Sequence, residues 1–261
     1  MSVTALPTRP VGQLLRDWRE RRRLSQLELS NQAEISTRHL SFVETGRSRP
    51  TPEMILRLSE HLDVPLRERN QLLLAGGYAP AYPQHGLDEP ELGSVQAALR
   101  LVLSAHEPFP ALVINRWWEL LDANAAVGVL TAGCAAHLLE PPVNVLRLSL
   151  HPDGMAPRIA NLGQWRAHLL GQVRRRADDT GDERLRELHD ELADYPGGAR
   201  STLPPNNVVL PLRLRHECGE LSFFSIAAKV ETAADVTVDE LTVEAFYPAD
   251  PETNSRMRAL V

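Results

Sequence analysis

The sequence of 261 residues is poor in cysteine, in aromatic residues and in lysine, of which it has one. Its two cysteines, Cys134 and Cys218, are too few for a disulfide framework, so we expect a reducing, cytoplasmic setting rather than secretion. Residues 1–23 hold no apolar run of the length that a signal peptide needs. The longest uncharged run, residues 123–139, is too short and too polar for a membrane span. We therefore expect no association with a membrane.

The usual motifs of enzymes are also missing. There is no glycine-rich phosphate loop, no Gly-x-Ser-x-Gly and no recognisable pair of catalytic carboxylates. Zinc-type ligands occur as two pairs, Cys134 with His137 and His216 with Cys218, but neither pair has the spacing of a zinc motif. The apolar neighbours of Cys134 favour a buried, unreactive thiol. We expect no catalysis, no metal site and no cofactor.

What is present fits a globular protein of one or two domains, with 43% hydrophobic and 24% charged residues. The charge is distributed unevenly along the chain. Residues 1–80 hold 12 arginines and 9 acidic residues, whereas residues 81–261 hold 16 basic and 25 acidic residues. A basic segment followed by an acidic one favours contact between the first segment and a polyanion.

The first 77 residues predict an all-helical domain of five short helices. The first helix has one apolar face, made of Val11, Leu14, Leu15 and Trp18. Ser25 and Glu28 have the spacing of a capping box, which predicts the start of a second helix. A third helix is expected after Ser36, which would be its N-cap, and is expected to stop at Gly46.

The fourth and fifth helices begin with prolines. Thr51–Glu53 combine a capping residue, a proline at the first helical position and an acid in the first turn. Pro65 opens the fifth helix, which ends at Gly76–Gly77. Residues 78–91 contain three prolines and no apolar periodicity, so we expect them to be a linker.

Residues 92–255 predict an α+β domain, because helical spacing of apolar residues gives way to strand patterns. The expected helices cover residues 92–103, 123–139, 162–176 and 183–193. The expected strands cover residues 111–115, 119–122, 208–214, 221–228 and 240–247. The last three strands follow one another, so an antiparallel sheet is expected.

Two segments closely resemble the helix-turn-helix of the phage-repressor-like (XRE) family, and matching positions extend over about 55 residues. These segments are Leu24–Leu29 and Glu44–Pro50. Three others, Ser36–Gly46, Val64–Asn70 and Leu74–Pro80, look like the MmyB-like regulators. In that family a DNA-binding domain of this kind precedes a PAS-like ligand-binding domain.

The second domain carries the MmyB-like resemblance in Val113–Ala126 and Pro142–Arg147. The resemblance implies a small apolar ligand, such as a fatty acid, held between the sheet and the helices over it. The candidate ligand-binding residues are Trp117, Asn144, Arg147, Trp165 and Phe223. Ordinary core or surface is the commoner place for each of these residue types. Arg147 could pair with a carboxylate of the ligand, or it could bridge two elements of the empty protein.

The third helix is expected to enter the major groove of double-stranded DNA, which admits one helix. Leu40 and Val43 mark its core side, so the residues on the opposite side face outward. The candidate DNA contacts on this helix and beside it are Gln26, Ser36, Thr37, Arg38, Ser41, Phe42, Thr45, Arg47 and Arg49.

Different contacts are expected to have different roles. Arg38 suits a guanine and Phe42 suits a thymine methyl, whereas Gln26, Arg47 and Arg49 are placed for phosphates. Phe42 could instead pack against a neighbouring helix or the second domain. Arg47 and Arg49 could lie in a solvated loop.

The sequence thus predicts a sequence-specific transcription regulator that binds its operator as a homodimer. Ligand binding in the second domain would alter how the two recognition helices are held. Two other functions stay open. The protein could be an antitoxin-like interaction module whose C-terminal domain binds a partner protein, or the second domain could turn over its ligand.

Overall fold

The computed structural model describes residues 9–197 and 209–260, and the chain divides into two compact units. The first unit comprises Met1–His85 together with Thr232–Asp239. The second comprises Gly86–Glu231 together with Glu240–Val261. A segment from late in the chain therefore belongs to the N-terminal helical unit.

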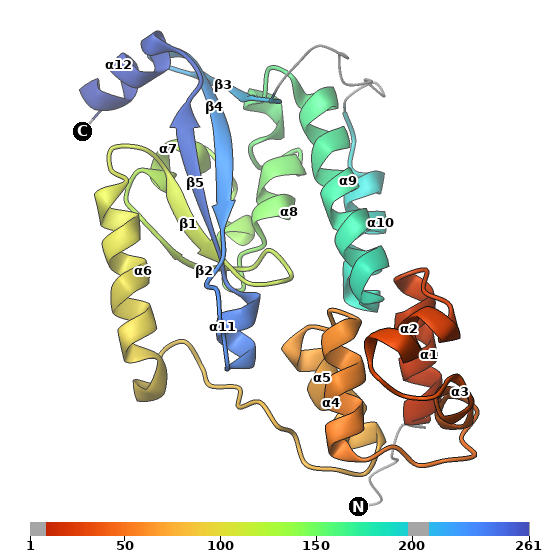
Figure 1. Ribbon diagram of the computed structural model, residues 1–261. Coiled ribbons are helices and arrows are strands. Elements are labelled where there is room, and N and C mark those ends of the chain that lie inside the picture. The colour runs from red at the N-terminus through yellow and green to blue at the C-terminus, as the bar shows by residue number, and fades with distance from the viewer. Residues whose placement is uncertain (1–8, 198–208, 261) are drawn as a thin grey trace, which may run out of the picture. The chain divides into compact units, whose positions relative to one another are not determined.

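Five helices build the N-terminal part of the first unit, as the sequence predicts (Figure 1). They are α1 (Val11–Arg21), α2 (Gln26–Gln32), α3 (Thr37–Glu44), α4 (Pro52–His61) and α5 (Leu66–Ala75). The predicted caps are confirmed. The Ser25 hydroxyl accepts the N–H of Glu28 at 3.1 Å, and the Glu28 carboxylate accepts the N–H of Ser25 at 2.7 Å. Ser36 and Thr51 cap α3 and α4 through their hydroxyls.

One apolar cluster fills this unit, and each of the five helices contributes to it. Among its fully buried side chains are Leu15, Leu29, Leu40, Ile55 and Leu72. Trp18 is only 4% exposed, so its predicted place in the core is confirmed.

Helices α1 and α3 approach each other backbone to backbone at Gly12. A Cβ atom at this position would overlap the carbonyl oxygen of Val43 and lie 3.1 Å from that of Glu44. No other residue type leaves this space empty. Gly12 therefore fixes the last turn of α3 against α1.

The second unit contains a five-stranded antiparallel sheet with the strand order β2-β1-β5-β4-β3. Its strands are β1 (Ala111–Ile114), β2 (Leu120–Ala123), β3 (Leu212–His216), β4 (Gly219–Ala228) and β5 (Thr242–Pro248). All five lie where strands are predicted. Strand β3 starts after Pro211, which has no N–H to donate. The predicted start at Val208 lies outside the described residues.

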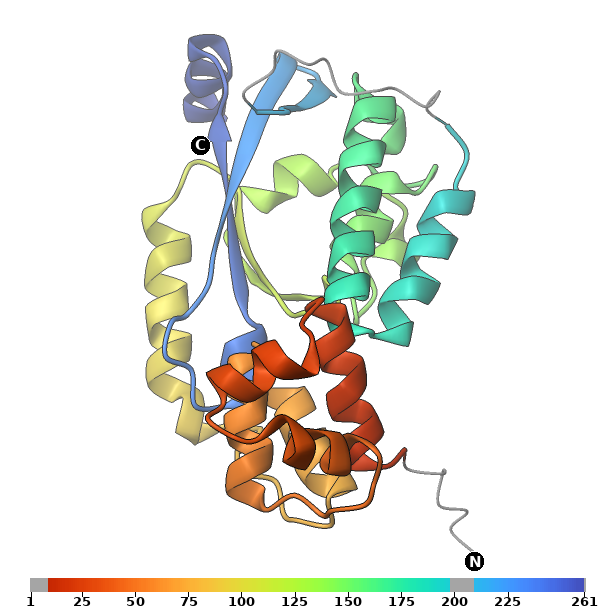
Figure 2. The ribbon, with the colours of Figure 1, turned by 45° about the vertical axis from the view of Figure 1, so that its right-hand side comes forward.

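The two faces of the sheet pack against different helices (Figure 2). Leu112 and Ile114 of β1 point into a large cluster with α7 (Val127–Thr131), α8 (Val145–Leu150), α9 (Leu162–Thr180) and α10 (Glu183–Asp194). Ala111 and Val113 point to the opposite side, where they meet α6 (Gly93–Ala105). This alternation is the two-residue period of a strand that is covered on both faces.

The remaining helices differ in part from the prediction. They are α6 (Gly93–Ala105), α7 (Val127–Thr131), α8 (Val145–Leu150), α9 (Leu162–Thr180), α10 (Glu183–Asp194), α11 (Val236–Glu240) and α12 (Pro251–Ala259), with 3-10 helices at Pro90–Leu92, Ala136–Leu138 and Ala156–Arg158. Residues 123–139, where the apolar pattern favours a pair of helices, contain α7 and a 3-10 helix, and Gly133 at φ +73° separates the two. Within the described residues, no helix has the length and apolar character needed to cross a membrane.

The segment Thr232–Asp239 is held in the first unit by hydrogen bonds. The Asp235 carboxylate accepts the backbone N–H of His85 at 3.1 Å and lies 2.8 Å from Nδ1 of that residue. The Asp239 carboxylate accepts the N–H of Leu66 at 3.3 Å. This N–H opens α5, whose own N-cap position holds a proline without a side-chain acceptor. The connection between β4 and β5 is thus part of the helical unit.

Candidate nucleic-acid interface and apolar cavity

Helix α3 turns one side to the core of the first unit and the other side to solvent. Leu40 and Val43 are buried, whereas Arg38 and Thr45 are exposed and Phe42 is half-buried. This is the orientation that the spacing of apolar residues predicts. The exposed side carries no acidic residue, because the acid of this helix, Glu44, is turned to the inside.

Phe42 groups two positive charges on the outward side of α3. The Cζ atom of Arg38 lies 5.3 Å from the centroid of the Phe42 ring, and that of Arg47 lies 5.9 Å from it. A cation–π contact holds a guanidinium over an apolar surface without neutralising its charge. Both arginines therefore keep their donors for an anionic partner or for the acceptor edge of a base.

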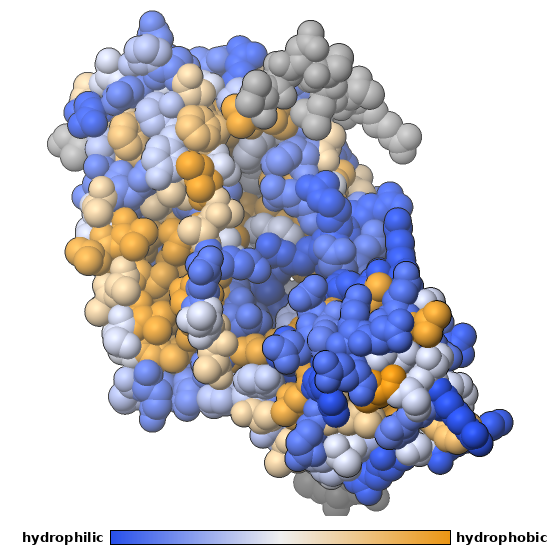
Figure 3. Space-filling model, viewed as in Figure 1, coloured by the Kyte–Doolittle hydropathy of each residue, from blue (hydrophilic) through white to orange (hydrophobic). Residues whose placement is uncertain are grey.

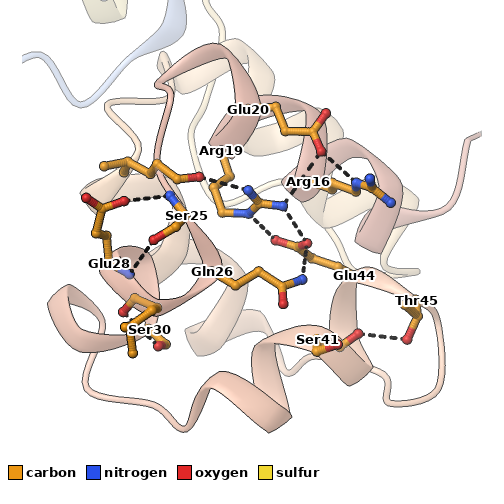
Figure 4. Close-up of polar contacts among 12 residues, drawn as sticks. Arg16, Arg19, Glu20, Ser25, Gln26, Glu28, Ser30, Ser41, Glu44 and Thr45 are labelled. Carbon is orange, nitrogen blue, oxygen red and sulfur yellow. Dashed lines mark hydrogen bonds and ion pairs between the residues drawn. The ribbon is translucent and has the colours of Figure 1, made fainter.

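A buried ion pair holds the C-terminal end of α3 (Figure 4). The Glu44 carboxylate accepts two hydrogen bonds from Arg19 of α1, with Nε at 2.7 Å and Nη2 at 2.9 Å. Gln26 of α2 donates its Nε2 to the same carboxylate at 2.8 Å. The side chain of Glu44 is 1% exposed and that of Arg19 is 10% exposed. The hydrogen bonds to Glu44 raise the pKa of Arg19, so its guanidinium stays charged.

The sequence interpretation quoted Glu44 within a family motif but assigned it no role. A signal was present, because Glu44 follows Leu40 by four residues and therefore lies on the core side of the helix. A charged residue on a core face needs a partner. The partner, Arg19, lies 25 residues earlier and could not be chosen among twelve arginines from spacing alone.

The second unit contains a cavity of about 320 Å³ between the inner face of the sheet and helices α7, α8 and α9. This volume lies at the small end of the range for ligand pockets. Its lining is mostly apolar and comprises Leu112, Leu120, Ala123, Asn124, Val127, Gly128, Leu130, Thr131, Leu139, Val143, Val145, Leu146, Leu148, Ser149, Met155, Trp165, Leu169, Leu212, Glu244 and Phe246.

Glu244 brings an acidic group into this apolar lining from the middle of β5. Burial raises the pKa of Glu244, whereas a hydrogen bond from the Ser225 hydroxyl and the charge of Arg176 act in the opposite direction. The sequence analysis did not select Glu244. The available signal was its spacing of two residues from Phe246, which places both side chains on one face of the strand.

The matches to known families agree with this arrangement. A family model described as the MmyB-like transcription regulator ligand binding domain matches residues 95–260, and a helix-turn-helix domain model matches residues 10–72. The chain belongs to the MmyB-like transcription regulators. It therefore combines a helix-turn-helix domain, whose third helix is α3, with a C-terminal ligand-binding domain that contains the cavity. The chain matches no curated protein.

Several hydroxyls predicted to contact DNA have partners inside this MmyB-like regulator. Ser36 caps its helix, and the hydroxyls of Thr37 and Ser30 lie 2.9 Å apart. Thr45 donates its hydroxyl to the carbonyl of Ser41 at 2.7 Å. A hydroxyl that donates to one group can still accept from another, so these contacts leave each of them able to meet DNA.

Two of the residues predicted to contact phosphates also stabilise the helix-turn-helix domain. Gln26 donates to Glu44, as described above. Arg49 donates Nε at 3.2 Å and Nη2 at 2.7 Å to the carbonyl of Gly76, and its Cζ lies 5.0 Å from the ring centroid of Tyr78. Their contacts with DNA stay a prediction, as does the whole set of nine residues.

Of the five residues predicted for the ligand pocket, Trp165 lines the cavity of the regulator. Phe223 is fully buried in the core behind it. Arg147 bridges α8 to α10, because its Nε and Nη2 donate to Glu191 at 2.8 and 2.7 Å. This pairing lowers the pKa of Glu191. The bridging role, which the sequence left open, is the one that the structure contains.

The other two residues, Trp117 and Asn144, lie outside the lining and support each other. Asn144 caps α8 with its Oδ1 atom and donates Nδ2 to the carbonyl of Trp117 at 2.8 Å. The Trp117 indole donates to Asp182 at 2.9 Å. The polar groups of both residues form hydrogen bonds that stabilise loops. In a sequence, residues with this role have the same pattern as residues that bind a ligand.

The two zinc-type pairs do not form one site in the regulator. His216 and Cys218 contact each other across the β3–β4 turn, with 3.0 Å between Nδ1 and Sγ. His137 instead groups with His151 and Asp153, whose ligand atoms all lie within 4.8 Å of one another. Burial raises the pKa of Cys134, which keeps its thiol protonated.

Proposed function

We propose that this regulator recognises a DNA operator through α3 and that a small apolar ligand in the cavity controls this binding. The observation that carries the proposal is the outward face of α3, where two arginines flank a half-buried ring. The opposite side of the helix is locked to α1 and α2 through Glu44. A rigid helix with free donors on one side is what base recognition requires. The proposed place of action is the cytoplasm.

The roles along this face follow from chemistry. Arg38 lies within the helix and suits the O6 and N7 acceptors of a guanine, and Phe42 suits the methyl group of a thymine. Arg47 follows the helix and suits a phosphate, which positions the domain without reading sequence. Since the ring of Phe42 contacts both arginines, it also fixes the spacing between Arg38, which would contact a base, and Arg47, which would contact a phosphate.

We infer that the operator-bound form is a homodimer and that α6 supplies its interface. The inner side of α6 packs on the sheet through Leu99 and Leu103. Its outer side is also apolar, with Leu101 70% exposed and Val102 50% exposed, and Figure 3 shows apolar side chains gathered over this helix. A helix that is apolar on all sides is normally buried. The outer side has alanines at 97, 98 and 105 and little charge, so it fits a second copy of itself.

The control of DNA binding has a structural route in the segment between β4 and β5. Strand β5 lines the cavity with Glu244 and Phe246, and the chain just before it belongs to the helical unit. There Asp239 caps α5. A ligand that shifts β5 would therefore act on the start of α5. The antiparallel sheet and its helical cover also support the PAS-like interpretation of this domain.

The proposal is tested by DNA-binding titrations with the DNA that flanks the gene. Arg38→Ala should weaken binding by about 1–3 kcal/mol and relax the preference at one base pair. Arg47→Ala should weaken all sequences alike and reduce the slope of log K against log salt by about one. Arg57→Ala is the matched control, because Arg57 is exposed on α4 and lies outside the proposed face.

Two results would decide for the alternatives. If no salt-sensitive, sequence-preferring complex forms, the antitoxin-like interaction module is favoured. If native mass spectrometry recovers a bound molecule that the protein has altered chemically, the second domain is an enzyme. Equal effects of Arg38→Ala and Arg47→Ala would refute the division between base reading and phosphate contact.

A further inference from the structure

The lining of the cavity has an unusual charge balance. Sixteen of its twenty described residues are apolar, none is basic, and one, Glu244, is acidic. A carboxyl group surrounded by apolar side chains is costly to bury unless a partner compensates it. The hydrogen bonds of the polar lining residues therefore indicate which ligand chemistry fits the cavity.

Three polar residues of the lining use their hydrogen-bonding groups within the protein. Asn124 accepts the N–H of Ala111 with Oδ1 and donates Nδ2 to two backbone carbonyls at 3.1 and 2.8 Å. Ser149 accepts the indole N–H of Trp165 at 3.0 Å. Thr131 donates to a carbonyl of its own helix at 3.4 Å. None of the three is a strong anchor for a charged ligand.

Glu244 keeps capacity to accept hydrogen bonds. The backbone register of β5 sets it opposite Leu112 of β1 and Ala227 of β4, in the middle of the sheet. Hydrogen bonding to Ser225 acts to lower the pKa of Glu244, and a carboxylate has room for about four hydrogen bonds. Glu244 is therefore placed to accept donors from a molecule in the cavity.

Arg176, the cation whose charge acts on Glu244, has its own contacts elsewhere. The Arg176 guanidinium stacks on the Trp118 ring, with Cζ 3.9 Å from its centroid. Its Nη1 atom donates to the carbonyl of Arg116 at 3.0 Å. Arg176 thus acts on Glu244 through its charge at longer range. A ligand can occupy the place at Glu244 that Arg176 does not take.

We infer that the cavity binds an apolar molecule whose polar end donates hydrogen bonds, an amine above all, and that it disfavours a carboxylate. This rests on the proposed function, in which the cavity is the ligand site. An ammonium group would complete a charge-assisted hydrogen bond with Glu244. A fatty acid would bring a second carboxyl group to the first, and the two cannot both be ionised at close range. The inference thus departs from the fatty acid that the family resemblance suggests.

The test is calorimetric titration of the full chain with three probes of equal chain length: decylamine, decan-1-ol and decanoate. Decylamine should bind at least about 10-fold more tightly than decanoate, since a hydrogen bond to a charged group contributes about 10- to 100-fold in affinity. Glu244→Gln keeps the shape and an acceptor for Ser225, and it should remove most of this preference. Decan-1-ol should lose little affinity in the same variant.

A second variant separates the cavity from unspecific binding. Ala123 is part of the lining and pairs with Leu112 in the register of the sheet, so its side chain lies on the cavity side of β2. Ala123→Phe should therefore obstruct the cavity, with loss of affinity for all three probes.

The outcomes distinguish this inference from the function on which it rests. If the three probes bind equally, if decanoate binds most tightly, or if the preference survives in Glu244→Gln, the inference is wrong, although the cavity is still a ligand site. If no probe binds, or if Ala123→Phe leaves all affinities unchanged, the proposed apolar ligand site is wrong as well.

Discussion

Removal of the Glu44 carboxylate is expected to loosen α3 more than any other single charge change in the helix-turn-helix domain. The side chain is 1% exposed and accepts hydrogen bonds from Arg19 and Gln26. In Glu44→Ala, a guanidinium that is 10% exposed loses its close counter-charge and keeps Glu20 at 3.8 Å and the carbonyl of Leu24. Breaking a buried pair in this way costs about 3–5 kcal/mol, because the remaining charge is desolvated and has lost its close partner.

The assay is hydrogen exchange read by mass spectrometry, since it reports peptides of α1 to α3 separately from the second unit. A loss of about 3–5 kcal/mol corresponds to roughly 100-fold to more than 1,000-fold faster exchange of amides protected by opening of this domain. Glu44→Gln keeps the size of the side chain and one acceptor, so it should show a smaller change in the same peptides. Arg38→Ala changes an exposed charge on the same helix and should leave exchange nearly unchanged.

Glu20→Ala is the matched control for the removal of an acid. Glu20 accepts Arg16 Nε at 2.7 Å and lies 3.8 Å from Arg19 Nη2, but its side chain is 52% exposed and water can replace these contacts. If Glu44→Ala speeds exchange in α3 no more than Glu20→Ala does, the ion pair does not hold the recognition helix. The argument for a rigid reading face would then fail.

Three further predictions concern other parts of the chain. Gly12→Ala should destabilise the first unit by about 1–3 kcal/mol in urea unfolding, because its methyl group would overlap the carbonyl of Val43; unchanged stability would show that α1 can shift freely. Leu101→Glu combined with Val102→Glu should convert a dimer to a monomer in light scattering, and a dimer that persists would place the interface elsewhere. Asp239→Ala should cost about 1 kcal/mol of stability through the lost cap and should reduce the effect of ligand on DNA affinity; an undiminished ligand effect would exclude this route.

The fold was predictable where the determining contacts are local. Ser25 and Glu28 satisfy each other within one turn, so the start of α2 can be read from four residues. Strand alternation likewise located the five strands. The placement of Thr232–Asp239 could not be predicted, because the pairing of His85 with Asp235 spans 150 residues. The pattern of neighbouring residues does not predict a contact between positions so far apart in the sequence.

The same distinction applies to the site. The outward side of α3 follows from the 3.6-residue period of a helix, because the spacing of the buried residues in the sequence is enough to determine it. The assignment of Arg49 and Arg147 to external partners did not foresee their partners in the protein, Gly76 and Glu191. A long side chain can reach any acceptor within several ångströms, and only the tertiary structure selects one. The cavity was out of reach for a similar reason, since its lining comes from strands and helices far apart in sequence.

Asp239 and Glu240 are adjacent in sequence, but each carboxylate accepts a hydrogen bond within a different unit. Asp239 accepts an N–H of α5 in the first unit, and Glu240 accepts Arg116 Nη1 at 3.0 Å in the second. The carbonyl of Arg116 in turn accepts a hydrogen bond from Arg176 Nη1 at 3.0 Å. The positive charge of Arg176 acts to lower the pKa of Glu244 in the cavity. Under the proposed function, a ligand that changes the charge of Glu244 would act on Arg176 and, through Arg116, on Glu240. It can shift DNA binding only as far as it prefers one arrangement over the other, and DNA must then change the affinity for ligand by the same factor.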